Sequence, residues 1–325
     1  MTTVETYRGP VDMSELGTTL VHEHVFVRNP ELETNYPRSH WDEARLVKEA
    51  IDSLNSLVDK GISTMVDLTV LGLGRDVELV RKVADNTTMN IVAATGWYTR
   101  RDLPLFFHSN GPGRLIDGPD PLIEMMVKDL TVGIADTGVK AALIKVVTDE
   151  DGITSDIERT LQAAAVAHQE TGATIMTHSH AALETGRLQL DYFEKAGVPL
   201  EHVVVGHCGD STDIDYLREI MDRGTYVGLD RFGMENALSD ELRCDIVAKL
   251  VELGYVDRIA MSQDAQFYSV NRPPSWREQN APRWSHHNIS DNILPALRSR
   301  GVTEETLNRI LMDNAARILA GARSE

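Results

Sequence analysis

Eight short segments rich in apolar and β-branched residues recur along the chain, and this repetition limits the possible folds more than any other feature. The segments are residues 18–27, 62–70, 90–98, 141–148, 173–179, 202–206, 226–230 and 258–262. Several are continuous apolar runs, such as Ile91-Val-Ala-Ala and His202-Val-Val-Val, which are typical of parallel strands covered on both faces. Between them, apolar residues at helical spacing predict helices over residues 42–60, 120–137, 155–171, 213–223 and 240–253.

Alternation of strand and helix predicts an α/β protein with a parallel sheet. Eight such units close into a (β/α)8 barrel, a TIM barrel, in which active-site groups lie at the C-terminal ends of the strands. A doubly wound open sheet is the alternative. The 325 residues suit a single barrel domain over residues 1–325. Residues 100–121 and 265–287 are long enough to act as lid-like loops, and residues 303–320 are expected to form a closing helix.

The formal charge of −18 excludes two classes of partner. A strongly acidic surface repels nucleic-acid phosphates and anionic lipid headgroups, so we expect neither nucleic-acid nor membrane binding. No signal peptide is visible, and no apolar run approaches the roughly 18 residues of a membrane span. Cys208 and Cys244 form no C-x-x-C pair, so we expect two reduced thiols in a cytoplasmic protein.

The first strand carries the pair His22 and His24. Strand residues two apart point to the same face, so both imidazoles project into the barrel mouth. Neutral imidazole is a common ligand of zinc and similar metals. Glu23 lies between them and is expected to face outward, toward the helices, so we do not predict it to be a ligand.

Further residues of ligand type stand at the ends of other strands. His178 closes the fifth strand, His207 follows the sixth and Asp264 follows the eighth. Each lies at the C-terminal end of its strand, where the active sites of such barrels are found. An isolated H-x-H pattern is a weak signal, but its coincidence with three further ligand types predicts a metal site.

Lys145 is unusual because it lies within the apolar fourth strand, Leu143-Ile-Lys-Val-Val. A buried charged lysine is costly unless it is paired or modified. Reaction with carbon dioxide would give a carbamate that bridges two cations. The alternatives are a lysine of depressed pKa that forms a Schiff base, and a lysine paired with a buried acid. The surrounding histidines favour the carbamate.

Together these residues resemble the phosphotriesterase-like branch of the amidohydrolase superfamily, and most closely its lactonases, including bacterial N-acyl-homoserine lactonases. The resemblance covers nearly the whole chain, and its motifs are modest singly but specific together. They are Arg8-Gly-Pro, Leu20-Val-His-Glu-His, Val66-Asp-Leu-Thr, Ala94-Thr-Gly-Trp-Tyr, Lys145, Thr177-His, Gly206-His-Cys-Gly-Asp-Ser-Thr-Asp, Asp230-Arg-Phe-Gly and Ser262-Gln-Asp.

The resemblance implies a role for each candidate residue. His22, His24 and Asp264 would hold a buried metal, His178 and His207 a more exposed one, and N6-carboxylated Lys145 would bridge both. Zinc is the favoured metal, with cobalt, manganese or iron as alternatives. The catalytic residues implied are Asp264 for proton transfer, Tyr98 beside the substrate, and Arg231, which would pair with Asp210. The family also implies a homodimer.

The resemblance therefore implies a lactonase that acts on small neutral lactones or esters, above all N-acyl-homoserine lactones, with weak phosphotriesterase activity. Asp230-Arg231 favours lactones, because phosphotriesterases proper tend to carry histidine after this aspartate. Trp276 and Trp284 are expected to flank an acyl chain. The alternatives are a phosphotriesterase or another esterase on the same metals, a Schiff-base aldolase or lyase using Lys145, and a barrel that only binds.

Overall fold

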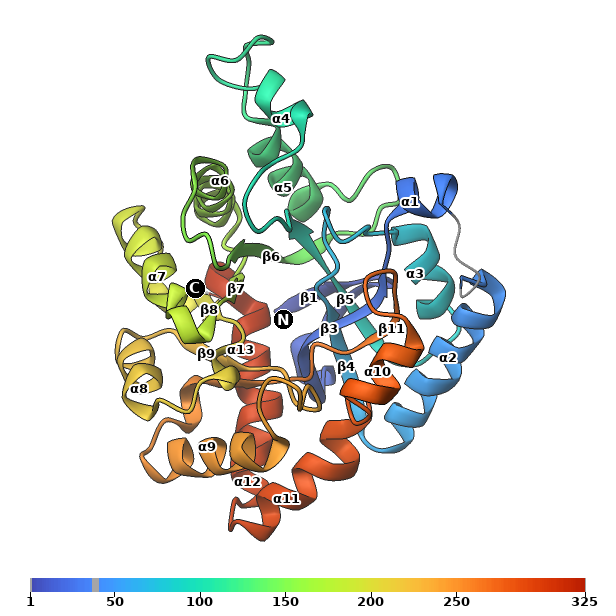
Figure 1. Ribbon diagram of the computed structural model, residues 1–325, viewed down its shortest axis with the longest axis vertical. Helices are drawn as coiled ribbons and strands as arrows, with labels where there is room; N and C mark the ends of the chain where they lie inside the picture. The colour runs from blue at the N-terminus through green and yellow to red at the C-terminus, as the bar shows by residue number, and fades with distance from the viewer. Residues whose placement is uncertain (1, 37–40, 325) are drawn as a thin grey trace.

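A parallel β-barrel surrounded by helices forms the centre of the protein (Figure 1). The computed structural model describes residues 2–36 and 41–324. Nine parallel strands follow the order β10-β9-β8-β7-β6-β5-β4-β3-β11. The chain between β10 and β11 lies against β3, where Asp264 N donates to His22 O and His24 N donates to Ala265 O, each at 2.9 Å. These bonds close the ring, so the predicted barrel is confirmed.

The barrel strands match the eight predicted segments closely. They are β3 (Thr18–Val27), β4 (Ile62–Asp67), β5 (Asn90–Gly96), β6 (Ala141–Thr148), β7 (Ile175–Ser179), β8 (Val203–Val205), β9 (Tyr226–Leu229) and β10 (Ile259–Met261). The remaining strands are the hairpin β1 (Thr3–Thr6) and β2 (Gly9–Asp12), and β11 (Gln266–Ser269), which pairs with β3.

Most of the helices surround the barrel (Figure 1). They are α1 (Pro30–Asn35), α2 (Glu43–Asp59), α3 (Val77–Ala84), α4 (Leu105–Ser109), α5 (Pro121–Thr131), α6 (Ser155–Thr171), α7 (Thr185–Lys195), α8 (Ile214–Asp222), α9 (Asp240–Glu252), α10 (Pro274–Asn280), α11 (Leu294–Ser299), α12 (Glu304–Asn308) and α13 (Ala315–Ala320). No helix among the described residues is long and apolar enough to cross a membrane.

Neighbouring residues of each strand contribute to different hydrophobic layers, because side chains alternate across a strand. Within β4, Val66 joins the cluster that fills the barrel and Met65 joins the cluster beneath the helices. The same alternation separates Leu143 from Ile144 in β6. Burial on both faces explains why these strands read as continuous apolar runs rather than as alternating ones.

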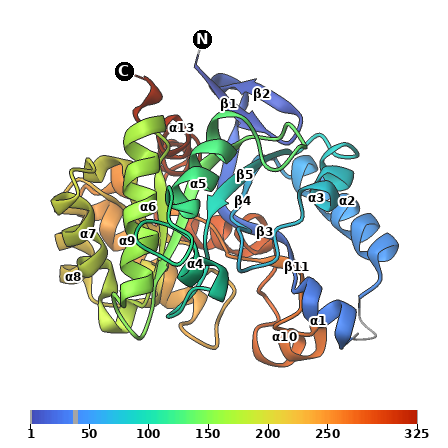
Figure 2. The same cartoon turned by 90° about the horizontal axis from the view of Figure 1, so that it is seen from above.

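The two ends of the barrel differ (Figure 2). The hairpin β1–β2 and both termini lie at one end, and α1 and α10 lie at the other. At the first end, Ile318 and Leu319 of α13 join the cluster inside the barrel, so the predicted closing helix covers its N-terminal end. The opposite end carries the loops that follow the strands, and it is there that the candidate residues lie.

Some predicted boundaries are wrong. The helix expected over residues 120–137 ends at Thr131, because Gly133 has a φ of 138° and Ala135 a φ of 48°, values that turn the chain out of a helix. The long segments 100–121 and 265–287 are also not plain loops. The first contains α4, which projects from the barrel with its flanking chain, and the second contains β11 and α10 (Figure 1).

Candidate metal centre

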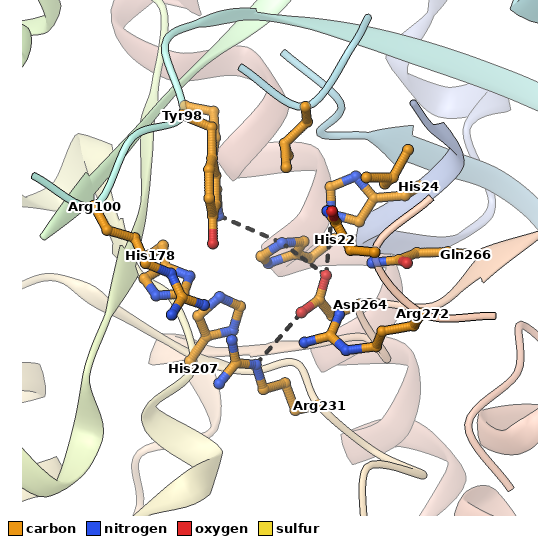
Figure 3. A pocket seen from close by; sticks show the side chains of 14 residues that line it. His22, His24, Tyr98, Arg100, His178, His207, Arg231, Asp264, Gln266 and Arg272 are labelled. Carbon is orange, nitrogen blue, oxygen red and sulfur yellow. Dashed lines mark hydrogen bonds and ion pairs between the residues drawn. The ribbon is translucent and has the colours of Figure 1, made fainter. Parts of the chain in front are cut away.

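One cavity of about 370 Å³ at the C-terminal ends of the strands is lined by all six candidate ligands (Figure 3). Their side chains come from five parts of the barrel. They are His22 and His24 of β3, Lys145 of β6, His178 of β7, His207 after β8 and Asp264 after β10. Residues up to 242 positions apart in the chain, as Asp264 and His22 are (264 − 22), therefore meet at one place.

His22, His24 and Asp264 form a tight buried group. Asp264 Oδ1 lies 3.0 Å from His24 Nε2 and 3.6 Å from His22 Nε2. Their potential ligand atoms all lie within 4.8 Å of one another, and all three residues are buried. Burial opposes ionisation of Asp264, but the nearby histidines hold the pKa of its carboxyl well below the ordinary value. A carboxylate and two imidazole nitrogens facing one point suit a divalent metal.

His178 and His207 form a second pair beside this group. Their ring centroids are 4.5 Å apart, and the ring of His207 is 5.0 Å from that of His22. Burial is the main cause that lowers the pKa of His178 to about 4 and the pKa of His207 well below its ordinary value. Both rings are therefore neutral at pH 7, which is the form that binds metals.

The backbone is strained at two of the six residues. His207 has a φ of 65° and Asp264 a φ of 52°, which places both in the left-handed region. Only four residues other than glycine have positive φ in the described part of the chain. Such conformations cost about 1–3 kcal/mol and are concentrated at functional sites. The strain aims both side chains into the cavity at the point where their strands end.

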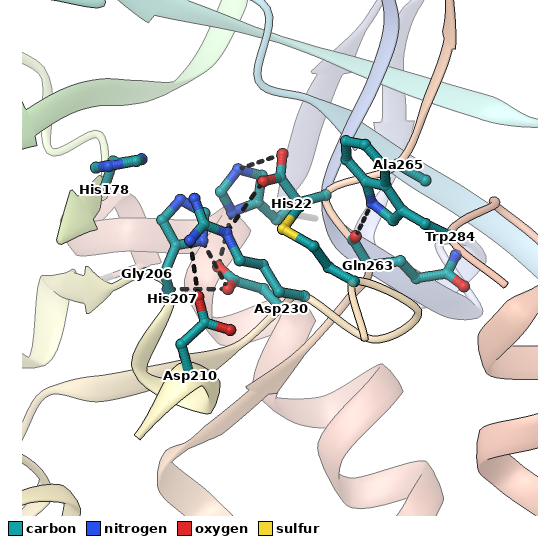
Figure 4. A network of polar contacts seen from close by, with 12 residues as sticks. His22, His178, Gly206, His207, Asp210, Asp230, Gln263, Ala265 and Trp284 are labelled. Atoms are coloured by element: carbon teal, nitrogen blue, oxygen red, sulfur yellow. Dashed lines mark hydrogen bonds and ion pairs between the residues drawn. The ribbon is translucent and has the colours of Figure 1, made fainter. Parts of the chain in front are cut away.

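Asp230 bridges two of the histidines from below (Figure 4). Its Oδ2 accepts from His22 Nδ1 at 2.7 Å, and its Oδ1 accepts from His207 Nδ1 at 3.0 Å and from His207 N at 2.9 Å. Burial opposes its ionisation, yet these contacts hold the pKa of Asp230 well below the ordinary value. Because each Nδ1 carries the proton, the Nε2 atoms are left free to bind a metal.

The other two histidines are oriented in the same manner. His24 Nδ1 lies 2.9 Å from Thr69 Oγ1, and His178 Nε2 lies 2.8 Å from Asp149 Oδ2. His24 therefore offers Nε2 and His178 offers Nδ1 to the cavity. Polar partners behind metal-binding histidines fix the ring tautomer and orientation.

Lys145 is buried without a carboxylate partner among the described residues. It is 1% exposed, and its Nζ lies 3.4 Å from His22 Nε2 and 3.2 Å from Thr177 O. Burial lowers the pKa of the amine to about 8. The structure therefore removes one alternative of the sequence analysis, in which a buried acid pairs with this lysine. A buried amine of lowered pKa beside His22 fits either a carbamate or a Schiff base.

Glu23 points away from the cavity, as expected, and its hydrogen-bond partners lie in the chain that follows β10. Its carboxyl is fully buried and accepts from Ser262 Oγ at 2.6 Å, from Gln263 N at 2.9 Å and from Ala265 N at 2.9 Å. These bonds clamp the segment on both sides of Asp264 against β3. Glu23 does not line the cavity and, as predicted, is not placed as a ligand.

Tyr98 and Arg231 both lie on the cavity wall. The Tyr98 ring is 5.6 Å from the His178 ring. Arg231 pairs with Asp210 at 2.7 Å, and its Nε lies 3.4 Å from Asp264 Oδ2. Burial opposes the charge of Arg231, but these two carboxylates raise its pKa. Arg231 can therefore orient Asp264.

The expectation that Trp276 and Trp284 flank an acyl chain was wrong. Trp284 is 2% exposed and packs with Met234, Ala265 and Ala281, and Trp276 packs against the same cluster. Neither tryptophan lines the cavity. Two apolar residues, Val27 and Leu73, and three arginines, Arg100, Arg231 and Arg272, lie there instead.

Sequence reasoning missed the residues that support the ligands, namely Asp149, Asp230, Thr69 and Glu23. One signal was present: Asp149 directly follows a predicted strand and Asp230 is the last residue of another, at the end of the barrel where polar groups converge. Arg100 and Arg272 gave no such signal, because loop arginines are common on protein surfaces.

A barrel of this kind with imidazole, carboxylate and lysine side chains converging at its strand ends defines a metal-dependent hydrolase. Comparison with known proteins identifies the family. The model of the Phosphotriesterase family matches residues 2–319. The chain therefore belongs to the phosphotriesterase family, and the resemblance to this family seen in the sequence is confirmed.

Individual proteins of this kind are similar to the chain over almost its whole length. The phosphotriesterase homology protein of Mycobacterium tuberculosis is 46% identical over 318 residues, covering 98% of each chain. The aryldialkylphosphatase of Saccharolobus solfataricus is 34% identical over 306 residues, covering 94% of this chain and 95% of its own. The solved structure of the phosphotriesterase from Mycobacterium tuberculosis superimposes with a TM-score of 0.95 at 45% identity, covering 98% of both chains.

Proposed function

We propose that this enzyme is a binuclear metal-dependent lactonase that acts on N-acyl-homoserine lactones and quenches the signalling that depends on them. The observation that carries the proposal is the position of Tyr98 on the cavity wall, with its ring 5.6 Å from that of His178. A phenol there can donate a hydrogen bond to the ring oxygen of a lactone as that oxygen becomes an alkoxide.

Two divalent metals account for the donor set. In this proposal His22, His24 and Asp264 hold one metal, and His178 and His207 hold the other. Zinc suits these donors, which also accept cobalt, manganese or iron. When bound, the cations stabilise hydroxide at neutral pH and polarise the substrate carbonyl.

Lys145, as a carbamate, would help to hold both metals. Its neutral amine attacks carbon dioxide, a carbon–nitrogen bond forms, and one proton leaves to solvent. The lowered pKa of about 8 favours this reaction, since a larger fraction of the amine is unprotonated near neutral pH than in an ordinary lysine. Conversion to a carboxylate would also resolve the burial of an amine that has no acidic partner.

Asp264 is the proton carrier in the proposed reaction. Its Oδ1 faces the histidines, and its Oδ2 lies 3.4 Å from Arg231 Nε. Asp264 accepts a proton from the attacking water as the water oxygen bonds to the carbonyl carbon, and returns that proton to the alkoxide as the acyl–oxygen bond of the ring breaks. Arg231, held by Asp210, keeps the carboxylate oriented between these two positions. The product is a hydroxy acid.

A comparison of lactones with phosphotriesters tests the proposal. Purified enzyme loaded with zinc or cobalt is assayed by acid release from N-acyl-homoserine lactones and by nitrophenolate release from paraoxon. We expect a higher kcat/KM for lactones and a weak activity toward paraoxon. Replacing Tyr98 with phenylalanine should lower kcat/KM for lactones by about 100-fold, with little effect on paraoxon, because nitrophenolate leaves without a proton donor.

Two alternatives have distinct outcomes in these assays. The names of its relatives favour a phosphotriesterase, and a higher kcat/KM for paraoxon than for every lactone would establish that function instead. An aldolase or lyase would form a Schiff base on Lys145. Borohydride trapping of Lys145 with a carbonyl substrate would support it, and carbon dioxide on Lys145 would exclude it.

We also propose that the enzyme forms a homodimer through its projecting arm, residues 105–116. Leu105, Phe106, Leu115 and Ile116 are all more than half exposed there, and the arm extends away from the barrel (Figure 1). Exposed apolar groups concentrated in one segment are typical of an interface. Light scattering should give twice the mass of one chain, and Leu115→Glu should shift it toward the monomer. A monomeric wild-type protein would refute this assembly.

A further inference from the structure

Three arginines line the cavity beside the candidate ligands, together with a single carboxylate, that of Asp264. We propose that Arg272 binds a carboxylate carried by the substrate, so that the enzyme prefers lactones whose substituent ends in a carboxylate over neutral ones. This inference rests on the proposed lactonase function and adds the substrate class. Figure 3 shows Arg272 beside Asp264 and Arg231, and Arg100 next to His178.

Two of the three arginines already have carboxylate partners. Arg231 pairs with Asp210 at 2.7 Å and also contacts Asp264. Arg100 Nε lies 3.0 Å from Asp149 Oδ2. Their charges are therefore largely compensated within the protein, although both guanidinium groups still border the cavity.

Arg272 differs because it has no hydrogen bond or ion pair to a carboxylate among residues 2–36 and 41–324. It is partly buried, and burial lowers the pKa of its guanidinium. The group nevertheless stays protonated, since arginine does not lose its proton in proteins. Partial desolvation of a charge without a partner is unfavourable, and an anion in the cavity would supply that partner with charge-assisted hydrogen bonds.

The side chain of Arg272 is also held in position. Its guanidinium carbon lies 5.0 Å from the ring centroid of Trp284 and 5.8 Å from that of Trp276. Trp284 is itself fixed, because it is buried and its Nε1 donates to Gln263 O at 2.9 Å. The two tryptophans thus orient the arginine rather than the substrate. A pre-oriented guanidinium loses little conformational freedom when it binds an anion.

The positive charge of Arg272 on the cavity wall contrasts with the net negative charge of the chain. With a formal charge of −18, the protein as a whole repels anions. The uncompensated charge of Arg272 on the cavity wall gives a neutral lactone no charge–charge attraction. A substrate with a negative group does benefit, because its attraction to Arg272 at contact distance outweighs repulsion by distant acidic groups. Salt screens that repulsion beyond about 8 Å.

A matched pair of homoserine lactones tests the inference. N-succinyl-homoserine lactone ends in a carboxylate, and its terminal amide has the same shape without the charge. Both are assayed with metal-loaded wild type, Arg272→Met, Arg272→Lys and, as a control, Arg283→Met. Arg283 lies in the same connection but does not line the cavity.

We expect the wild type to show a kcat/KM at least tenfold higher for the carboxylate than for the amide. Arg272→Met should reduce this ratio to about one through a lower kcat/KM for the carboxylate, and a zinc content equal to that of wild type would show that the centre is intact. Arg272→Lys should retain a ratio of several fold, and Arg283→Met should match wild type.

Two results would overturn the inference and leave the lactonase intact: a wild-type ratio of one or below, or an unchanged ratio in Arg272→Met. Hydrolysis of neither compound, nor of any other lactone, would overturn the proposed function and the inference together.

Discussion

Replacing Asp230 with asparagine perturbs the metal centre without removing a ligand. Asp230 is 1% exposed and does not line the cavity, but it accepts hydrogen bonds from Nδ1 of both His22 and His207. Asparagine has nearly the same shape, with one oxygen and one amide nitrogen. At one of the two histidines, the amide nitrogen of the asparagine must then face the protonated Nδ1, so that two donors meet.

The expected magnitude follows from this mismatch. The affected histidine must either rotate or move its proton to Nε2, and a protonated Nε2 cannot bind a metal. Loss of such a supporting partner typically reduces metal affinity or activity by 10- to 100-fold, which corresponds to about 1.4–2.7 kcal/mol. We expect Asp230→Asn to fall in this range.

Competition with a chromophoric chelator measures the affinity for zinc in wild type and variant. Asp129→Asn is the control, because Asp129 is a buried carboxylate that pairs with Arg75 at 2.8 Å and touches no histidine. We expect the control to keep its zinc affinity even if its stability falls. Equal zinc affinity in wild type and Asp230→Asn would refute the view that Asp230 orients these two ligands.

Three further predictions concern Lys145, His286 and Gly206. Native mass spectrometry of wild type is expected to show a mass increase of one carbon dioxide. Lys145→Met should abolish this increase and lower activity at least tenfold. A wild-type protein without the increase would contradict the carbamate. Burial lowers the pKa of His286 from 6.5 to about 3, so the unfolded chain takes up its proton first and stability falls as the pH drops below 6.5. Between pH 6.5 and 5, the stability measured by urea unfolding should fall by about 2 kcal/mol less in His286→Gln than in wild type. A Cβ on Gly206 would lie 2.1 Å from Thr177 O, so Gly206→Ala should destabilise the protein by about 1–3 kcal/mol in the same assay, whereas Gly118→Ala, in open space, should not.

The barrel could be predicted from the sequence because strands that are buried on both faces appear in it as continuous apolar runs. Where such a run lies between two segments of helical pattern, as Ile91-Val-Ala-Ala does, a buried parallel strand is its simplest interpretation. Boundaries were less predictable where a turn depends on backbone angles. The end of α5 is set by Gly133, and glycine alone does not reveal which φ it adopts.

The convergence of six side chains on one cavity was also predictable, since barrel topology brings the C-terminal ends of all strands together. The supporting contacts were not, because they depend on side-chain direction after the strand has ended. Glu23 illustrates this: alternation placed it away from the cavity, but only the three-dimensional path of residues 262–265 provided its partners. Trp284 was misplaced for the same reason, since its loop folds back against the core.

The crystal structure of metal-loaded enzyme, with anomalous scattering recorded at the metal absorption edge, tests the central claim most directly. We predict two anomalous peaks in the cavity, one against His22, His24 and Asp264 and the other against His178 and His207. Electron density for a carboxylate on Lys145 Nζ should lie between them. A single peak away from these residues, or an unmodified Nζ distant from both ions, would contradict the proposed centre and the chemistry built on it.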